Sequence, residues 1–421
     1  MQANGEFLEF PVHENSLISG NGAEVLAPAF AGLFDLLNRR KASSTMKITP
    51  PGYIASLEAY KPGKPISDVI AEYGLTDVIK LASNENPLGP SPKAIEAAKA
   101  SLSDLHHYPN GGKTLREAIA RKYGLSINET IAGSGSEGVM NTVMRTFLEA
   151  GDEVLTSEAT FSGFYVLANA MGLKTITVPT RDHGYDLTSM ADRITENTRL
   201  IYLANPNNPT GTVFGRSAFE AFYKQVPKDV ILLCDEAYYD YAVRDVPDYF
   251  TMVDDIRPNV LTLRTFSKSH GLAGIRIGFG TGPKELILPM LKVKLPFEPS
   301  TTAQAAGIAA LDDEDFLSRT IETNQIGKEY FRRAFSSLGI SFVDTAANFF
   351  LLPFPSADDA TAFVSEMERR GIIVRPCDGS GLPTGVRISI GTKEENQRAI
   401  EAIKAILRTT ANHSSLSTST T

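Results

Sequence analysis

Cysteine is scarce in this chain, which has two cysteines in 421 residues. Cys234 and Cys377 lie far apart in the sequence, so they offer neither a disulfide framework nor a closely spaced pair of thiolate ligands for zinc. Because proteins of reducing compartments generally lack disulfides, this usage indicates a cytoplasmic protein.

Long apolar runs are absent as well. The best candidate, residues 25–37, contains Asp35 and falls short of the ~20 apolar residues that a membrane-spanning helix needs. The first basic residue is Arg39, and several acidic residues precede it, whereas secretory signals begin with basic residues and transit peptides avoid acidic ones. We therefore expect no membrane association and no targeting segment.

Positive charge is in deficit, with 41 Lys and Arg against 49 Asp and Glu and a formal net charge of −8. This balance argues against nucleic acid or an anionic membrane as the main partner. The histidines also offer no metal motif, because His106 and His107 are adjacent and their side chains diverge, and no H-x-x-x-H or H-E-x-x-H spacing occurs. We expect no bound metal.

The pattern that is present is an alternation of short apolar runs with segments of helical period, in a chain too long for one ordinary domain. Near-continuous apolar strands separated by helices are typical of a sheet that is buried on both faces. The predicted fold is therefore α/β, with a mostly parallel, doubly wound sheet in a large domain. The apolar runs occupy residues 153–156, 174–178, 200–204, 230–234 and 260–263.

The sequence pattern changes after about Pro299. Longer segments of helical period and a few short apolar runs there predict a smaller α+β domain. The end of the chain is rich in Ser and Thr and has almost no apolar content, which is typical of disorder. The predicted boundaries are an N-terminal extension at 1–45, an N-terminal arm packing near the small domain at 46–80, the large domain at 81–299, the small domain at 300–408 and a disordered tail at 409–421.

Ligands of doubly wound sheets bind beyond the carboxyl ends of the strands, so polar residues that follow the apolar runs are the candidate site. The loop Gly-Ser-Gly-Ser-Glu-Gly at 133–138 matches G-x-G-x-x-G, a weak signal alone. An acid closing the next strand would support dinucleotide binding, but Asp152 and Glu153 precede that strand. Backbone N–H groups at a helix N-terminus still suit any phosphate, the alternative being a plain turn.

Asp235 directly follows a predicted central strand, and Tyr238 comes three residues later. Lys268 follows another strand, and Arg276 comes eight residues after it. Taken singly, these are equally a turn-capping acid, a solvated lysine and a surface arginine. Together with the phosphate loop and the amide-rich turn at 205–211, they suit a phosphorylated aromatic cation carried on a lysine, which describes pyridoxal phosphate.

The order and spacing of several motifs resemble the fold-type I, class II pyridoxal-phosphate-dependent aminotransferases, and most closely the histidinol-phosphate aminotransferase family, from about Tyr53 to Leu407. The resemblance implies a transaminase of histidine biosynthesis that exchanges an amino group between histidinol phosphate and 2-oxoglutarate. It is carried by motifs at 60–65, 83–87, 108–109, 208–211 and 235–238, by Ser267-Lys268 with Arg276, and by 386–391.

By this resemblance Lys268 binds the cofactor covalently and shuttles the substrate proton, and Asp235 pairs with the pyridinium nitrogen. Tyr238 and Asn208 would hydrogen-bond the ring oxygen, and Phe161 would lie against the ring face unless it is a plain core residue. The phosphate would be held by Ser136, Glu137, Thr265, Ser267 and Arg276.

The resemblance also implies a homodimer with shared active sites, because Tyr108 would reach the phosphate bound by the neighbouring subunit. Arg387 would bind the carboxylate of glutamate and, in the other half-reaction, the phosphate of histidinol phosphate; a surface arginine is its alternative. Tyr60 and Asn86 would complete the substrate pocket.

The chain departs from the family pattern at Glu298-Pro299, where members commonly read Asn-Val. This leaves the amino donor open between histidinol phosphate and an aromatic amino acid, phenylalanine or tyrosine. A pyridoxal-dependent decarboxylase is a further alternative on the same scaffold. A ligand-sensing protein that kept only the fold is disfavoured, because Lys268 is present.

Overall fold

The computed structural model describes residues 48–57, 59 and 63–417, with side chains as far as 409. The predicted extension at 1–45 therefore lies outside the described residues, as do Tyr60 and residues 418–421. The chain divides into two compact units, Met1–Ala55 and Ser56–Thr421. Of the first unit, the described part includes the short helix α2 (Gly52–Ala55).

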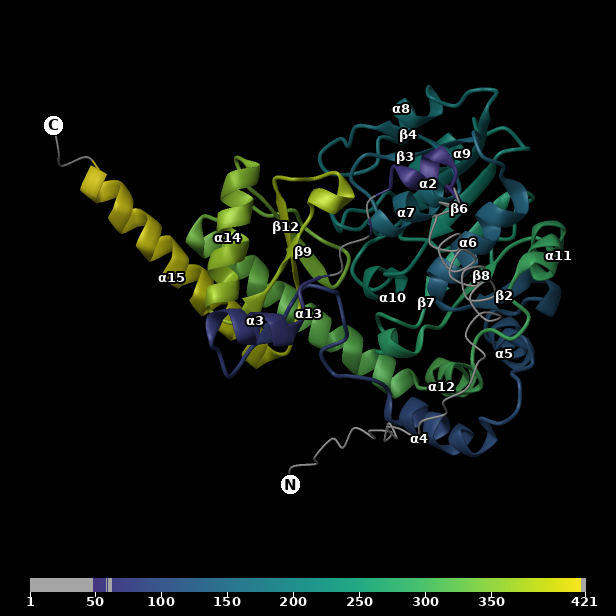
Figure 1. Ribbon diagram of the computed structural model, residues 1–421, viewed down its shortest axis with the longest axis horizontal. Helices are drawn as coiled ribbons and strands as arrows, with labels where there is room; N and C mark the ends of the chain where they lie inside the picture. Colours follow the sequence, from purple (N-terminus) through teal and green to yellow (C-terminus); the bar gives the residue numbers. More distant parts are fainter. Residues whose placement is uncertain (1–47, 58, 60–62, 418–421) are drawn as a thin grey trace, which may run out of the picture. The chain divides into compact units, whose positions relative to one another are not determined.

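A seven-stranded sheet with the strand order β2-β8-β7-β6-β5-β3-β4 forms the centre of the second unit (Figure 1). The five strands from β7 to β4 pair in parallel, whereas β8 is antiparallel to both of its neighbours. The predicted mostly parallel α/β sheet is thus confirmed. Its strands are β2 (Thr130–Gly133), β3 (Glu153–Ser157), β4 (Lys174–Val178), β5 (Thr198–Ala204), β6 (Ile231–Asp235), β7 (Val260–Thr265) and β8 (Gly278–Thr281).

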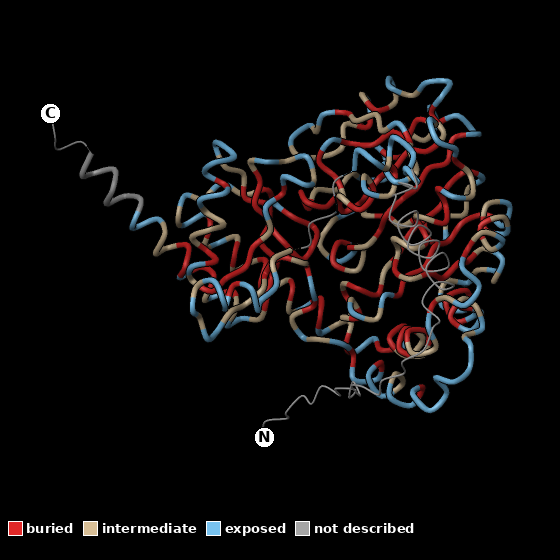
Figure 2. Tube along the Cα trace, in the orientation of Figure 1, coloured by how far each residue is buried: buried red, intermediate tan, exposed pale blue. Residues whose placement is uncertain are grey.

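Helices cover both faces of this sheet. Consecutive strand residues point to opposite faces, so the apolar side chains of each strand contribute to a core on both sides. Leu233 faces a core shared with α6 (Gly135–Phe147), whereas Leu232 faces a core shared with α9 (Arg216–Tyr223). Figure 2 shows the resulting buried interior of the strands. On the first face lie also α7 (Ser162–Ala170) and α11 (Lys284–Val293), and on the second α4 (Pro92–Ala100), α5 (Lys113–Tyr123), α8 (Leu187–Ala191) and α12 (Thr301–Leu311).

The small domain has an antiparallel sheet of order β11-β12-β9, covered by α13 (Glu314–Leu338), α14 (Ala357–Arg369) and α15 (Lys393–Ser417). This confirms the smaller α+β layer. Its strands are β9 (Phe349–Pro353), β11 (Arg375–Pro376) and β12 (Gly385–Ser389). Other short elements are α10 (Tyr239–Ala242), η1 (Ser101–Asp104), η2 (Ile127–Glu129), η3 (Ala273–Ile275) and η4 (Asp378–Ser380).

Two features of the structure bear on the predicted domain boundaries. The apolar face of α12, which includes Ala303 and Ala306, packs in a core with Leu115 of α5, so the large-domain core continues beyond 299. The helix α15 runs to Ser417 rather than ending before 409. Ser and Thr disfavour a helix interior only weakly, and extending an existing helix avoids the cost of nucleation.

Part of the predicted arm lies against the small domain. The strand β1 (Ile79–Lys80) pairs in parallel with β10 (Ile372–Ile373), and Val69 of α3 (Ile66–Tyr73) shares a small core with Ile373. None of the helices in the described part of the chain combines the length and the apolar character that a membrane span requires.

Candidate active site

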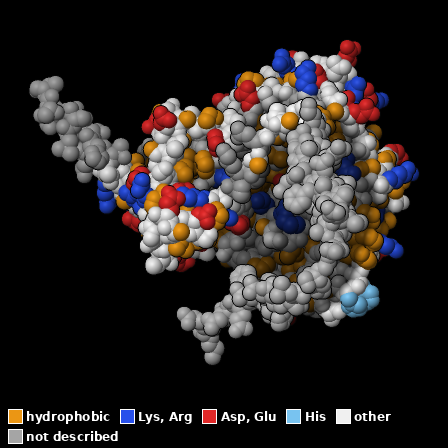
Figure 3. Space-filling model, in the orientation of Figure 1, with side chains coloured by type: hydrophobic (Ala, Val, Ile, Leu, Met, Phe, Trp, Pro, Cys, Tyr) orange, Lys and Arg blue, Asp and Glu red, His pale blue; other side chains and the backbone are white. Residues whose placement is uncertain are grey.

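A cavity of about 260 Å³ opens where the carboxyl ends of β5, β6 and β7 meet the small-domain strands β11 and β12. Basic side chains are visible in the hollow at the middle of the face shown in Figure 3. The cavity wall brings together most of the residues that the sequence singled out, namely Ser136, Glu137, Phe161, Asn208, Asp235, Tyr238, Thr265, Ser267, Lys268, Arg276 and Arg387.

Asp235 is the last residue of β6, so the parallel sheet presents its carboxylate at the cavity floor. The Tyr202 hydroxyl donates to one carboxylate oxygen at 2.8 Å, and the Ala237 backbone N–H donates to the other at 3.1 Å. Burial raises the pKa of Asp235 to about 6 despite these donors. A buried carboxylate of this kind is stabilised by a cationic ligand.

Lys268 lies in the turn that follows β7, and its ammonium donates to the Ser83 carbonyl at 3.1 Å. The same ammonium lies 5.7 Å from the centre of the Tyr238 ring. The turn depends on Gly271, which has a φ of +69°, and a Cβ there would lie 2.1 Å from the Gly89 carbonyl oxygen. Glycine is therefore required for the chain reversal that directs the lysine into the cavity.

The phosphate loop predicted at 133–138 lies at the N-terminus of α6, a helix of 13 residues. Backbone N–H groups in the first helical turn are free of intrahelical partners and carry partial positive charge, so they attract an anion. Arg276 crosses the loop opening and contacts the Glu137 carboxylate at 3.0 Å. The Thr265 hydroxyl donates to that of Ser267 at 3.0 Å on the neighbouring strand end. These groups fit a phosphate dianion.

A pair of arginines lines the cavity on the small-domain side. Arg375 and Arg387 are register partners across β11 and β12. The buried Arg387 guanidinium donates to the Asn208 side-chain oxygen and, at 2.7 Å, to the Ala82 carbonyl. An acidic protein thus has a cationic cavity, which suits substrates with an anionic group.

Two of the remaining candidates lie elsewhere. The Asn86 amide donates to the Ser269 carbonyl at 2.9 Å and to the Thr320 hydroxyl at 3.0 Å, so it braces the chain behind the cavity instead of lining it. Asn84, in the same motif, lines the cavity and donates to the Tyr238 hydroxyl at 2.9 Å.

Tyr108 does not line the cavity of its own chain. Its side chain is 80% exposed and stacks on the Phe297 ring, with 4.4 Å between the ring centres. The unusual Glu298 lies near the phosphate loop, where it accepts a hydrogen bond from the Ser134 hydroxyl at 2.7 Å.

Four cavity residues were not among the predicted site residues, namely Ser83 and Asn84 of the motif at 83–87, Tyr202 and Arg375. For Tyr202 a signal existed, because a phenol within a buried apolar strand needs a polar partner. Arg375 reaches the site only through its strand pairing with Arg387, which no local pattern reveals.

Comparison with known proteins agrees with this geometry. Residues 76–403 match the family described as "Aminotransferase class I and II". The histidinol-phosphate aminotransferase of Moorella thermoacetica is 42% identical over 356 residues, covering 84% of this chain and 92% of that protein. That of Symbiobacterium thermophilum is 40% identical, covering 84% and 97%.

A crystal structure of histidinol-phosphate aminotransferase from Sinorhizobium meliloti in complex with pyridoxal-5′-phosphate superimposes with a TM-score of 0.79 at 28% identity, covering 87% of this chain and 100% of that chain. Aspartate aminotransferase from Thermus thermophilus, at 24% identity and a TM-score of 0.74, shares the fold. The family match and the close relatives lead to one conclusion: the chain belongs to the class I and II aminotransferases.

Proposed function

We propose that this protein is a pyridoxal-phosphate-dependent aminotransferase that exchanges an amino group between histidinol phosphate and 2-oxoglutarate, a reaction of histidine biosynthesis. The observation that carries the proposal is the convergence of Lys268, Asp235 and the phosphate loop at 133–138 on one cavity. Relatives of about the same length that carry this name support the choice of substrate.

The residues present fit the cofactor group by group. Asp235 would accept a hydrogen bond from the ring nitrogen, and Tyr238 and Asn208 would hold the ring oxygen. Phe161 lies at the N-terminus of α7, on the cavity wall, where it would contact the ring face. The first turn of α6, through Ser136 and Glu137, would hold the phosphate together with Thr265, Ser267 and Arg276.

When bound, pyridoxal phosphate supplies an electron sink for carbanion chemistry. The chain supplies the acid and base. Lys268 is placed beside Tyr238 and Ser83, at the carboxyl end of the sheet, where its amine can take a proton from the substrate carbon and return it. The small-domain strands β11 and β12 form one wall of the cavity, where they would limit the access of water to that step.

The arginines favour a donor with a second anionic group. Histidinol phosphate has no carboxylate, so its phosphate is the group that Arg387 would bind, and the same guanidinium would bind a carboxylate of 2-oxoglutarate. Arg375, opposite Arg387 in the sheet, adds positive charge at the same wall. An aromatic donor would gain less from this concentration of charge.

We also infer a homodimer in which Tyr108 completes the partner's site. Tyr108 and Phe297 form an exposed aromatic pair, and Leu102, Leu105 and Leu295 add exposed apolar surface in the same two segments of the chain. Apolar side chains gathered on a surface in this way are typical of protein interfaces. Mixing a Tyr108→Ala chain with a Lys268→Ala chain should restore partial activity, because hybrid dimers would contain one intact site.

The state of the two cysteines supports a reducing compartment, and hence the cytoplasm, as the location of the protein. Cys234 and Cys377 are both free and buried. Burial raises the pKa of both thiols, which protects them from oxidation. Cell fractionation of the native protein would test this location.

The deciding experiment is the visible spectrum of the purified protein while histidinol phosphate and phenylalanine are added separately. Loss of the yellow band of the bound cofactor with histidinol phosphate alone would support the proposed donor. Loss with phenylalanine alone would assign the protein to aromatic substrates. If no yellow band forms after pyridoxal phosphate is added, the cofactor assignment fails.

A further inference from the structure

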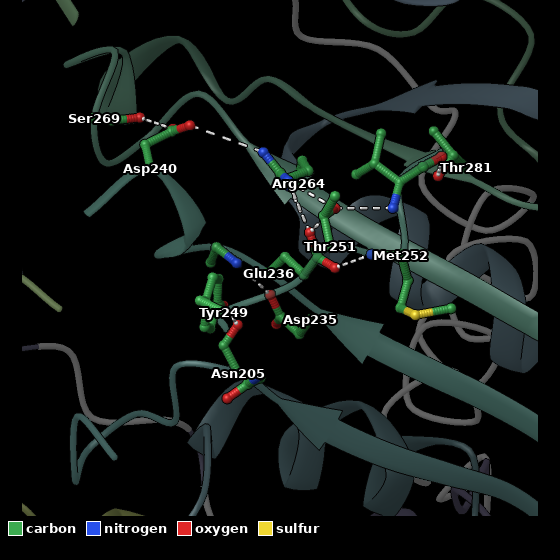
Figure 4. A network of polar contacts seen from close by, with 12 residues as sticks. Asn205, Asp235, Glu236, Asp240, Tyr249, Thr251, Met252, Arg264, Ser269 and Thr281 are labelled. Atoms are coloured by element: carbon green, nitrogen blue, oxygen red, sulfur yellow. Dashed lines mark hydrogen bonds and ion pairs between the residues drawn. The ribbon is translucent and has the colours of Figure 1, made fainter. Parts of the chain in front are cut away.

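Behind the cavity lies a buried polar network, and three of its members are sequence neighbours of site residues (Figure 4). Glu236 follows Asp235, Arg264 precedes Thr265, and Ser269 follows Lys268. Arg264, Glu236 and Ser269 are buried, and none of them lines the cavity formed by the described residues. Each turns away from the ligand space while its neighbour faces it, so the network is connected to the site through the backbone.

Arg264 is the centre of this network. Its Nε donates to Glu236 at 2.9 Å, its Nη2 donates to the Thr251 hydroxyl at 3.0 Å, and its guanidinium lies 3.6 Å from the centre of the Tyr239 ring. Glu236 also accepts from the Met252 backbone N–H at 2.6 Å. A buried charge pair with this many hydrogen bonds fixes the residue after Asp235 in one position.

Asp240 extends the network to the lysine turn. It lies on α10, 3.8 Å from Arg264, and accepts a hydrogen bond from the Ser269 hydroxyl. The carbonyl of Ser269 in turn accepts from Asn86 at 2.9 Å. The residue after Lys268 is therefore held through both its side chain and its backbone.

We propose that Asp240 is a positioning residue for Lys268, which it holds in register with Asp235 through Ser269 on one side and the Arg264–Glu236 pair on the other. This rests on the proposed function, because register between an amine and a carboxylate matters when one ligand must meet both. A small displacement of a reacting group is costly in rate, since catalysis depends on near-attack geometry.

The test compares Asp240→Ala with Asp240→Asn in the binding of pyridoxal phosphate and pyridoxamine phosphate. Both compounds use the phosphate loop and Asp235, but only the aldehyde forms a covalent bond with the Lys268 amine. Asp240→Ala should weaken equilibrium binding of pyridoxal phosphate by about tenfold, because a displaced amine meets the aldehyde in a poorer geometry. Its binding of pyridoxamine phosphate should change by less than about twofold.

Asp240→Asn keeps an oxygen that accepts from Ser269, so it should restore pyridoxal phosphate binding to near the wild-type value. Ser269→Ala removes the same hydrogen bond from the other side and should reproduce Asp240→Ala, with no further loss in the double variant. It also serves as the test if Asp240→Ala does not fold. The matched control is Asp254→Ala, which removes an exposed carboxylate.

Equal weakening of both compounds, or no weakening of pyridoxal phosphate in either Asp240→Ala or Ser269→Ala, would overturn the positioning role. Failure of the wild-type protein to bind either compound would instead overturn the proposed function. The two failures are thus distinguishable in one set of titrations.

Discussion

The guanidinium of Arg276 lies 3.0 Å from the carboxylate of Glu137, across the opening of the loop that begins α6. Both side chains are about half exposed, at 49% and 45%, so the pair is screened by water and contributes little to stability. Arg276 has a left-handed backbone, with φ of +53°, and a Cβ at Gly135 would lie 2.8 Å from its Nη2. The arginine thus lies close to the loop backbone, and Glu137 would compete with an anion for its guanidinium.

The first prediction concerns this pair. Arg276→Ala should weaken binding of pyridoxal phosphate by about 10–100-fold, because a hydrogen bond to a charged group contributes about 1.5–3 kcal/mol. Glu137→Gln should bind the cofactor as well as the wild type or better, since it removes the competing carboxylate. Fluorescence or absorbance titration of the cofactor-free protein would measure both. Weaker binding by Glu137→Gln would mean that the ion pair orders the loop instead of competing with the ligand.

The second prediction is that Lys268→Ala abolishes transamination while the fold persists. General acid–base catalysis alone contributes about 10²–10⁴-fold, and this variant also loses the covalent bond to the cofactor. Initial rates with histidinol phosphate and 2-oxoglutarate measure the loss, and circular dichroism checks the fold. Turnover at the wild-type rate would refute the assigned role of the lysine.

Much of the cavity lining was predictable because each polar residue that lines it lies next to its strand in sequence. Asp235 ends β6, and Lys268 follows β7 by a short turn, so an apolar run followed by a polar residue predicts both. The same local logic predicted the parallel sheet, because strands buried on both faces read as continuous apolar runs.

The cavity residues that the sequence did not single out depend on backbone direction and on long-range pairing. Asn84 and Asn86 lie in one motif, but only Asn84 lines the cavity, and its backbone is left-handed, with φ of +55°, which no composition reveals. Arg375 reaches the cavity only because β11 pairs with β12 in the register that places it opposite Arg387. Tertiary register of this kind is invisible to local patterns.

The third prediction uses the pKa of Asp235, which burial raises to about 6 from the model-compound value of 3.8. The folded, cofactor-free protein therefore binds this proton more tightly than the unfolded chain does. Stability from this group is complete below the unfolded pKa, is lost as pH rises toward 6, and is absent above it. The loss amounts to about 3 kcal/mol at most.

Asp235→Asn removes this titration and keeps an acceptor for Tyr202. The cofactor-free variant should therefore be more stable than the cofactor-free wild type at about pH 7.5, with little difference at about pH 4. Urea unfolding of both proteins at both pH values measures the change, and other titrating groups cancel in the comparison. A constant difference across pH would contradict the assignment of the raised pKa to Asp235.

The fourth prediction concerns substrate recognition by Arg387. Arg387→Ala should lower kcat/KM for histidinol phosphate and for 2-oxoglutarate by about 10–100-fold, because a buried charge-assisted contact to an anion is lost. The effect on histidinol phosphate should weaken as salt rises, since screening reduces the wild-type advantage. Arg333→Ala is the matched control, because Arg333 is a surface arginine of the same domain with a side chain 79% exposed. Equal effects of the two substitutions would contradict a role in recognition.

The last prediction tests the turn that carries the lysine. Gly271→Ala forces a Cβ to within 2.1 Å of the Gly89 carbonyl oxygen at a φ of +69°, so the turn must shift or the chain must strain. A residue forced into such a backbone costs about 1–3 kcal/mol, and the displaced turn should also weaken covalent capture of pyridoxal phosphate. Gly274→Ala is the control, because a Cβ there meets nothing within 4 Å. Thermal unfolding and cofactor titration should therefore show lower stability and weaker cofactor binding in Gly271→Ala than in Gly274→Ala. Equal stability and equal cofactor binding of the two variants would show that the turn tolerates displacement.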